Sequence, residues 1–566
     1  MTWHESGIYS RWRKSYLVLE QFWGRAVRAS QLERVGALLN FWASFIRTVT
    51  ALAHSFAKIA VSIVHGPVPT IDSPATHAGQ RSELSRTRPR DLLLLLLLTC
   101  AALLVQGYHP WAEDAEIYLP GVEKILQPEL FPFDAQFFQP HAHATLFPQL
   151  IAASVRYSHL PLSLALFIWQ IACIFLLLLA CWQLTGRCFV KPEARRAGVA
   201  LIASLLTLPV AGTALYILDQ YLNPRNIAAF LAIFGIVSVL DRKYLPAGIF
   251  LAAAAVIHPF MSAFAIFYCA LLVVSRGYGP RLALLSCWLP FGLTLDPPPK
   301  AYHFAAALHP FHYITRWHWY EWLGALAPLA ILWWFSRIAR ERNATNLRLI
   351  CRTLIFYELI FLPAAIVLSI PARFEALARL QPMRSLYLLY ILMFLFGGAF
   401  LGEYVLKNRL WRWLIFFLPL CAGMFAAQRM LFPSDAHIEW PGRASKNSWV
   451  RAFEWIRANT PTDAMFALDP NTMKIPDEDE QGFRAIAQRS RLADYRDSGQ
   501  ASMFPPLADF WYQQVRAQED WKTFQLADLE RLRAEYGVTW VVLQAPGPGT
   551  LNCPYREVIL VCRLVQ

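Results

Sequence analysis

Acidic side chains gather in residues 108–143, directly after the first long apolar run of the chain. Glu113, Asp114 and Glu116 lie within four positions of one another. Carboxylates beside a bilayer are costly unless they have a function, and a carboxylate in this position can act as a general base. If a helix begins near residue 117, Glu113 and Glu116 share one of its faces and Asp114 points elsewhere. The alternative is an interfacial loop whose charges are merely solvated.

A second polar group is the sequence DQYLNPRN at residues 219–226. Asp219 and Asn223 are four apart, so they share a face if this segment is helical. Pro224 is expected to start a new helix, which places Arg225 in its first turn. The planar guanidinium suits a phosphate. A capping Asn–Pro turn, with Arg225 reaching toward the interface, is an equally good interpretation.

Histidines and further arginines stand among aromatic residues later in the chain. His258 precedes Pro259 inside an apolar stretch. Such a break at membrane depth needs a cavity or a protein cover, so we expect His258 to contact substrate, with a tight helical hairpin as the alternative. Residues 296–322 hold His312 and Arg316 beside several Trp residues, which suits a sugar ring plus a phosphate. Histidine also binds metals, yet membrane interfaces collect the same residue types, and no metal site is assigned.

The composition indicates a polytopic membrane protein. The chain has 566 residues, of which 56% are hydrophobic and 16% are charged, and no soluble fold of this length needs so much apolar surface. The formal net charge of +13 does not indicate nucleic acid as a partner, because Lys and Arg lie mostly in short loops between apolar runs. Membrane lipids are the expected surroundings. No Cys spacing typical of a zinc site is present.

Eleven membrane spans are expected within a transmembrane domain at residues 91–428. They lie near residues 91–107, 160–184, 197–216, 226–240, 245–257, 259–275, 281–295, 323–338, 349–370, 386–405 and 411–428. The short basic loops are cytoplasmic by the positive-inside rule. The alternate loops, beginning with the acidic loop at residues 108–146, carry the unusual polar residues. Because the number of spans is odd, the two ends of the chain lie on opposite sides: the N-terminus in the cytoplasm and the C-terminal tail outside it.

Two regions flank the spans. Residues 1–65 are expected to form amphipathic helices on the membrane surface, or else a true span, and residues 66–90 a flexible linker. Residues 437–566 are expected to form a small α/β domain, with helices at 449–459, 482–491 and 526–536 and strands at 465–468, 538–543 and 558–565. No glycine-rich phosphate loop follows these strands, so the domain is expected to cover the site or position an acceptor. Cys553 and Cys562 could pair if the tail is extracytoplasmic.

Arginines in residues 371–385 depart from the positive-inside rule. Arg373, Arg379 and Arg384 fall on the outer side in the expected topology. Outer arginines of this kind need an anionic partner. Glu375 or the acidic first loop could supply it, but the charge balance favours a lipid phosphate for at least one of the three.

Several stretches together resemble a known class of protein. YLPGVEKI, DQYLNPRN and IHPFMSAF, together with WVRAFEWIRANTP and FRAIAQRS in the tail, resemble an uncharacterised bacterial group regarded as similar to the GT-C superfamily of membrane glycosyltransferases. The resemblance covers residue 92 to the end. It implies a GT-C-like fold in the bacterial inner membrane, with a polyprenyl-phosphate-linked sugar as donor and an acidic motif in the first outer loop, here Glu113-Asp114.

The resemblance and the residues together give a mechanistic hypothesis. Asp114 or Glu113, with Glu116 as a further candidate, takes a proton from an acceptor hydroxyl. Arg225, with Arg379 or Arg384, holds the donor phosphate.

His258 and residues 296–322 are expected to orient the sugar and the acceptor, which is a lipid, glycan or protein. A divalent cation bridging the acids and the phosphate is compatible with these residues but is not indicated by them. The runner-up is a transporter, or a protein that handles lipid or polysaccharide without transferase activity.

Overall fold

The computed structural model describes residues 87–277, 299–370, 375–475, 477–548 and 551–564. All of them belong to one compact unit, Gly79–Gln566. The expected helices of residues 1–65, nearly all of the linker at 66–90 and the span at 281–295 lie outside the described residues.

Seven helices in the described part of the chain are long and apolar enough to cross a membrane, which indicates a multi-pass membrane protein. They are α4 (Pro89–Gln106), α8 (Leu162–Cys188), α12 (Pro259–Gly277), α14 (Trp319–Glu341), α15 (Thr345–Ser369), the continuous helix Pro382–Leu406 and α18 (Leu410–Leu431). Helix Pro382–Leu406 consists of η6 (Pro382–Ser385), α17 (Leu386–Leu401) and η7 (Gly402–Leu406). Two shorter apolar helices, α10 (Pro224–Leu240) and α11 (Tyr244–Ile257), join them.

Helix α17 is the centre of this bundle. Nearly all its residues are buried, and it packs against α9 (Pro192–Ser204) and α14. In contrast, α4 and α18 leave many large apolar side chains exposed. Exposed leucines are expected on helices that face lipid tails, which are as apolar as leucine itself.

The expected span at residues 197–216 is wrong. Helix α9 ends at Ser204, and β1 (Pro209–Val210) pairs with β2 (Leu215–Tyr216) in a short antiparallel hairpin. Pro209 cannot continue a helix without losing a hydrogen bond. Gly212 has a φ of +63°, and a Cβ there would lie 2.4 Å from the ring of Trp317. The chain reverses direction next to the ring of Trp317. The segment is apolar because it is buried in the protein and not because it crosses the membrane.

The loops that the expected topology places on the outer side are largely helical. The first contains α5 (Ala115–Leu126), η1 (Ala135–Phe137), α6 (Gln139–Ala144) and α7 (Phe147–Ser158). Helix α7 is a separate short helix that precedes the long apolar helix α8. The segment between α12 and α14 contains α13 (Lys300–Ala307), η3 (Pro310–His312) and η4 (Ile314–Arg316), and the segment between α15 and η6 contains α16 (Glu375–Ala378).

The tail is a small α/β domain, as expected. Its helices are α19 (Ser448–Asn459), α20 (Phe483–Ala487), α21 (Ser498–Met503), α22 (Ala508–Ala517) and α23 (Leu526–Tyr536), with 3-10 turns at η8 (Thr472–Lys474), η9 (Pro505–Leu507) and η10 (Trp521–Thr523). Its strands are β3 (Met465–Ala467), β4 (Ser490–Arg491), β5 (Trp540–Gln544), β6 (Asn552–Arg556) and β7 (Ile559–Arg563).

These strands form one sheet in the order β4-β3-β5-β7-β6, parallel on the β4-β3-β5 side and antiparallel on the other. Helices α19 and α20 cover one face and α23 the other. The helix expected at 482–491 stops at Ala487, because Gln488 takes a left-handed φ of +54° and the chain then enters β4. Cys553 and Cys562 form a disulfide between β6 and β7.

Helix α20 of the tail docks on α5 of the first outer loop. Glu116 of α5 is fully buried, and its carboxylate accepts from the Arg484 backbone N–H at 2.7 Å and pairs with the Arg484 guanidinium at 3.1 Å. A second pair joins Glu116 to Arg491 at 3.4 Å. At Gly482, a Cβ would lie 2.9 Å from the Glu116 carboxylate, so only glycine permits this approach.

Candidate functional site

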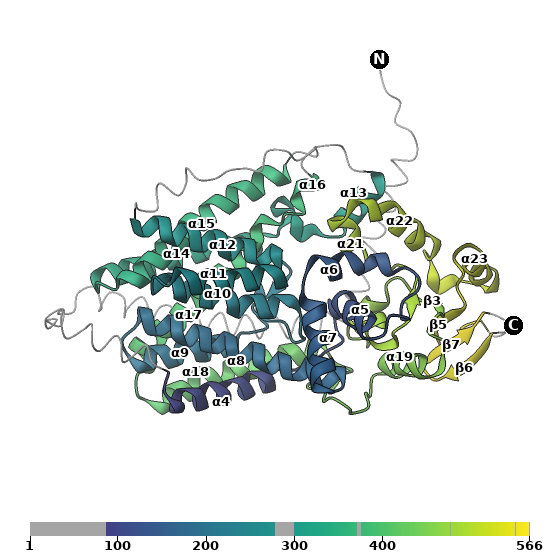
Figure 1. Cartoon of the computed structure of the whole chain (residues 1–566), viewed down its shortest axis with the longest axis horizontal. Coiled ribbons are helices and arrows are strands. Elements are labelled where there is room, and N and C mark those ends of the chain that lie inside the picture. The colour runs from purple at the N-terminus through teal and green to yellow at the C-terminus, as the bar shows by residue number, and fades with distance from the viewer. Residues whose placement is uncertain (1–86, 278–298, 371–374, 476, 549–550, 565–566) are drawn as a thin grey trace, which may run out of the picture. The chain divides into compact units, whose positions relative to one another are not determined.

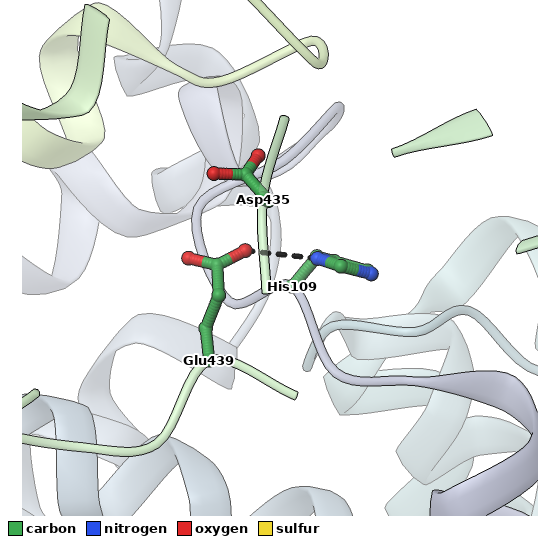
Figure 2. A group of neighbouring side chains, drawn as sticks. All are labelled: His109, Asp435 and Glu439. Carbon is green, nitrogen blue, oxygen red and sulfur yellow. Dashed lines mark hydrogen bonds and ion pairs between the residues drawn. The ribbon is translucent and has the colours of Figure 1, made fainter. Parts of the chain in front are cut away.

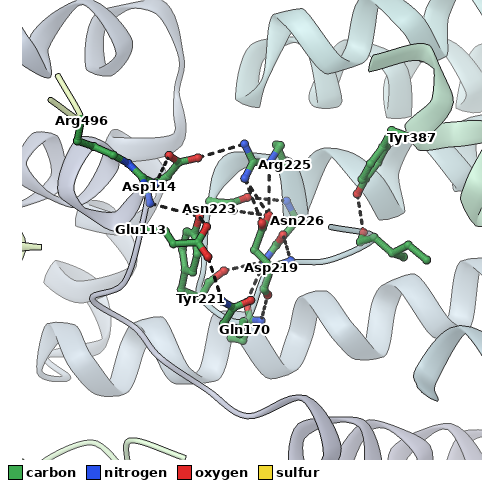
Figure 3. A network of polar contacts seen from close by, with 12 residues as sticks. Glu113, Asp114, Gln170, Asp219, Tyr221, Asn223, Arg225, Asn226, Tyr387 and Arg496 are labelled. Carbon is green, nitrogen blue, oxygen red and sulfur yellow. Dashed lines mark hydrogen bonds and ion pairs between the residues drawn. The ribbon is translucent and has the colours of Figure 1, made fainter. Parts of the chain in front are cut away.

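The site is built around Arg225, in the first turn of α10 (Figure 3). Its Nη1 donates to Asp114 Oδ2 at 3.2 Å, and its Nη2 donates to Asp219 Oδ1 at 3.1 Å. Asn223 is the N-cap of α10, and its side-chain oxygen accepts from the Asn226 N–H. Asn223 Nδ2 also donates to Asp219 Oδ2 at 2.6 Å. The capped Asn–Pro turn is confirmed, but Arg225 is buried and does not reach toward the interface. Phosphate binding by Arg225 stays a prediction.

Polar residues inside the bundle fix this turn. Gln170 of α8 donates to the Asp219 carbonyl at 2.7 Å and accepts from Asn226 Nδ2 at 3.1 Å. Tyr387 of α17 donates to the Ile217 carbonyl at 2.8 Å. A buried amide needs such partners, and Gln170 in the middle of an apolar helix was the signal that could have revealed the contact.

Asp114 lies between two guanidinium groups. Arg496 of the tail donates from Nη2 to Asp114 Oδ1 at 2.9 Å, opposite the contact with Arg225. Burial alone would raise the pKa of Asp114, but the charges of Arg496 and Arg225 outweigh it and hold this pKa well below its usual range. Asp114 is therefore ionised at neutral pH.

Glu113 has the opposite electrostatic environment. Burial, followed by the negative charge of Glu480, raises the pKa of Glu113 to about 8. Gln220 and the Tyr221 hydroxyl donate to its carboxylate at 3.3 and 3.4 Å. Glu113 has a φ of +52°, and α5 begins only at Ala115. The expected sharing of a helical face by Glu113 and Glu116 is therefore wrong, since Glu113 precedes the helix.

Arg384 lies in η6 and is half-buried, and its guanidinium is 5.6 Å from the ring centroid of Phe260. Its Nε is buried without a hydrogen-bond partner. Among the described residues, no ion pair joins Arg384 to a carboxylate. A cation in this environment favours an anionic ligand.

Arg225 and Arg384 line the same cavity, whose other walls come from α10, α12 and α17. The lining residues are Arg225, Ala228, Ala229, Ala232, Met261, Phe264, Ala265, Arg384, Tyr387, Leu388 and Ile391. Apart from the two guanidinium groups and the Tyr387 hydroxyl, these side chains are apolar. The cavity is narrow, about 20 Å³, with room for about one water molecule. It marks a point where two cationic groups meet apolar side chains, and it does not enclose a space the size of a lipid.

His258 lies between α11 and α12, near both arginines. The His258 side chain is buried there, within electrostatic range of Arg225 and Arg384. Its Nδ1 accepts from the Met261 N–H at 3.3 Å. The residue therefore caps α12, as the hairpin interpretation requires, and still lies beside the cationic groups.

The remaining sequence candidates are less central. His312 stacks on His309 with ring centroids 5.4 Å apart, and His309 Nε2 is 2.9 Å from Ser498 Oγ of the tail. Arg316 is exposed and lies 4.5 Å from the ring centroid of Tyr313. Arg379 donates to the Met503 carbonyl at 3.4 Å. The structure gives these residues contacts with the tail or with their own loop.

The sequence did not single out Arg496 or two tyrosines that surround the acidic pair. The Tyr221 hydroxyl accepts from the Asp114 N–H at 3.3 Å. Tyr118 of α5 packs edge-on against His141. No local signal identifies Arg496, because its partner lies in the first outer loop.

Comparison with known proteins gives a partial match. Residues 447–504 match a family described as a domain of unknown function, DUF6798. The matched stretch runs from the start of α19 to the end of α21. It includes Arg484, Arg491 and Arg496, which pair with the first outer loop. No curated protein matches the chain.

Proposed function

We propose that the protein is a GT-C-type membrane glycosyltransferase, which moves a sugar from a polyprenyl-phosphate donor to an acceptor on the extracytoplasmic face. The cavity lined by Arg225 and Arg384 carries this proposal. A polyprenyl phosphate combines an apolar chain with an anionic head, and at this point two guanidinium groups meet apolar side chains. Arg384 is more available than Arg225 to bind the phosphate, because Arg225 already pairs with Asp114 and Asp219.

In the proposed reaction, the acceptor hydroxyl oxygen attacks the anomeric carbon of the sugar. The bond between that carbon and the phosphate oxygen breaks, and the lipid phosphate leaves with the electron pair. Arg384 and Arg225 stabilise the negative charge on the leaving phosphate. Asp114, ionised and in contact with Arg225, accepts the hydroxyl proton.

Glu113 modulates this base. When Glu113 ionises, near pH 8, its negative charge raises the proton affinity of neighbouring Asp114. Glu116 has no part in this step, because its carboxylate is committed to Arg484 and Arg491.

The proposed orientation places the tail outside the cytoplasm and the N-terminus inside it, in the inner membrane of a bacterium. The disulfide between Cys553 and Cys562 supports this orientation, because disulfides persist in oxidising compartments.

Lipid binding tests the cavity. Full-length protein in nanodiscs is titrated with a short polyprenyl phosphate, with the matching polyprenol and with inorganic phosphate. We expect the polyprenyl phosphate to bind most tightly. Arg384→Ala should weaken its binding by about tenfold or more, the effect of a lost charge-assisted hydrogen bond, and Arg384→Lys should weaken it less. Arg340→Gln, which changes an exposed arginine of α14, is the control. Equal binding of polyprenol and polyprenyl phosphate would contradict the proposal.

Sugar transfer tests the chemistry. Release of labelled sugar from a panel of polyprenyl-phosphate sugars is measured with membrane extracts as the acceptor source, and Asp114→Asn should abolish it. Phosphate-lipid binding without sugar release from any donor would favour the second candidate, a lipid-handling or transport protein. The interruption between α11 and α12 at His258 and Pro259 is compatible with that alternative.

A further inference from the structure

A second polar cluster lies where the chain leaves α4 and where it leaves α18. His109, Asp435 and Glu439 each offer a ligand atom, and these atoms all lie within 4.8 Å of one another. Figure 2 shows the two carboxylates on the side of the imidazole that carries Nδ1. His109 Nδ1 is 2.9 Å from Glu439 Oε1. None of these residues belongs to the site around Arg225.

The backbone holds the two segments together. The Tyr108 N–H donates to the His437 carbonyl and the Glu439 N–H donates to the Tyr108 carbonyl, each at 3.0 Å. Gly107 has a φ of +79°, and a Cβ there would lie 2.6 Å from the His437 carbonyl oxygen. The ring of His109 stacks on Phe432 with centroids 3.9 Å apart. The three candidate ligands are therefore held in place by the fold.

Polar atoms in the cluster lack partners although they are buried. Asp435 is 3% exposed, and Gln481, which is fully buried, donates to its Oδ2 at 2.6 Å and to Glu439 Oε1 at 3.3 Å. Asp435 Oδ1 and Gln481 Oε1 have no hydrogen-bond partner. An unsatisfied buried acceptor is costly, so the cluster has unused capacity to bind a donor or a cation.

The local charge is also unbalanced. Glu478, which is fully buried with both carboxylate oxygens unpartnered, and Asp479 lie close to Asp435. Within the described residues, the basic side chain at ion-pair distance from these acids is the His109 imidazole, which carries a charge only when it is protonated. Arg429, the nearby arginine, donates to backbone carbonyls. Several buried carboxylates beside one imidazole call for further positive charge.

We propose that His109, Asp435 and Glu439 bind a divalent transition-metal ion, Zn²⁺ or Mn²⁺. One imidazole nitrogen with two carboxylate oxygens suits such ions better than Ca²⁺ or Mg²⁺, which prefer oxygen ligands alone. Gln481 presents its Nε2 to both carboxylates, so it orients these two ligands and is not itself a ligand.

The metal fastens the end of α4 to the segment that leads into the tail. Gln481, which contacts both carboxylate ligands, also forms a β-bridge with Ala112 of the first loop. The metal therefore holds this part of the tail in place as well. The role is structural and does not depend on the proposed transferase activity.

Metal content is the first test. Full-length protein in detergent is stripped with EDTA, dialysed against equimolar ZnCl₂ and MnCl₂, desalted, and analysed by mass spectrometry for bound metal. We expect one equivalent of Zn²⁺ or Mn²⁺ in the wild type and at least a tenfold loss of affinity in Glu439→Gln and Asp435→Asn, on the order seen when metal-site partners are removed. Asp463→Asn, an exposed carboxylate of the tail, should bind as the wild type does. Metal-free wild type, or equal binding by all four proteins, would overturn the proposal.

Thermal unfolding of the stripped wild type gives a second test, which does not depend on the variants folding. Adding ZnCl₂ or MnCl₂ should raise its Tm, since a ligand that binds only the folded state stabilises it. MgCl₂ and CaCl₂ should have little effect. A Tm that none of the four salts changes would refute the site, as would a rise that Ca²⁺ or Mg²⁺ produces as strongly as Zn²⁺ and Mn²⁺.

Discussion

Arg496 in the tail donates to Asp114 in the first outer loop at 2.9 Å, although 382 positions separate the two residues in the sequence. Arg225 contacts the other oxygen of the same carboxylate. The tail thus supplies one of the two cations that keep Asp114 ionised. It is part of the candidate site as well as a cover over the first loop.

Arg496→Gln should raise the pKa of Asp114 and weaken the docking of the tail. In the proposed transferase we expect activity to fall by about tenfold or more, because a hydrogen bond to a charged group contributes about 1.5–3 kcal/mol. Limited proteolysis should show faster cleavage around residues 477–497. Arg516→Gln removes an exposed pair with Glu519 and serves as the control. Unchanged activity and proteolysis in Arg496→Gln would show that this contact is dispensable.

Glu113→Gln should make the protein more stable and the proposed transferase slower. Glu113 holds its proton up to about pH 8 in the folded protein but only to about 4.5, its ordinary value, when unfolded. The folded state then binds more protons between these pH values, so stability should fall as the pH rises from about 4.5 through 8.

Glu113→Gln should remove that fall, and its Tm should exceed that of the wild type most clearly above pH 8. Transferase activity of the wild type should rise with pH through about 8, and the variant should be slower and lack this step. The measurements are Tm and rate from pH 5 to 9. A pH-rate profile that Glu113→Gln leaves unchanged would exclude the modulating role of Glu113.

Glu116→Gln should destabilise the protein strongly. Its carboxylate is the shared partner of Arg484 and Arg491, and breaking a buried ion pair typically costs about 3–5 kcal/mol. Chemical denaturation followed by tryptophan fluorescence measures this loss. Glu557→Gln, which breaks an exposed pair with Arg451, should cost at most about 1 kcal/mol. Equal stability of the two variants would contradict the structural role of Glu116.

Cys553 and Cys562 should be oxidised in cells if the tail lies outside the cytoplasm. Intact cells are treated with a membrane-permeant maleimide before and after reduction, and labelling at the two positions is read by peptide mass spectrometry. We expect labelling only after reduction, and a lower Tm of the purified protein in reductant, since native disulfides commonly contribute about 2–5 kcal/mol. Labelling without reduction would place the tail in a reducing compartment and contradict the proposed orientation.

The sequence by itself determined the features that depend on local pattern. Long apolar runs predict membrane helices, because a segment inside the bilayer must satisfy all its backbone hydrogen bonds itself and a helix does so. Alternating helices and strands predict the α/β tail, and the Asn-Pro pair predicts where α10 starts and hence where Arg225 lies. The same reasoning failed at residues 197–216, where composition cannot distinguish a span from a hairpin buried in protein.

The tertiary structure decided which polar residues meet. Docking of the tail places Arg496 beside Asp114 and commits Glu116 to Arg484, and the return of the chain after α18 places Asp435 and Glu439 beside His109. These contacts join segments hundreds of residues apart, so no local periodicity encodes them. An ion pair depends on the separation of its charges in space and on the solvent around them, and both are set only when the bundle, the first outer loop and the tail have packed together.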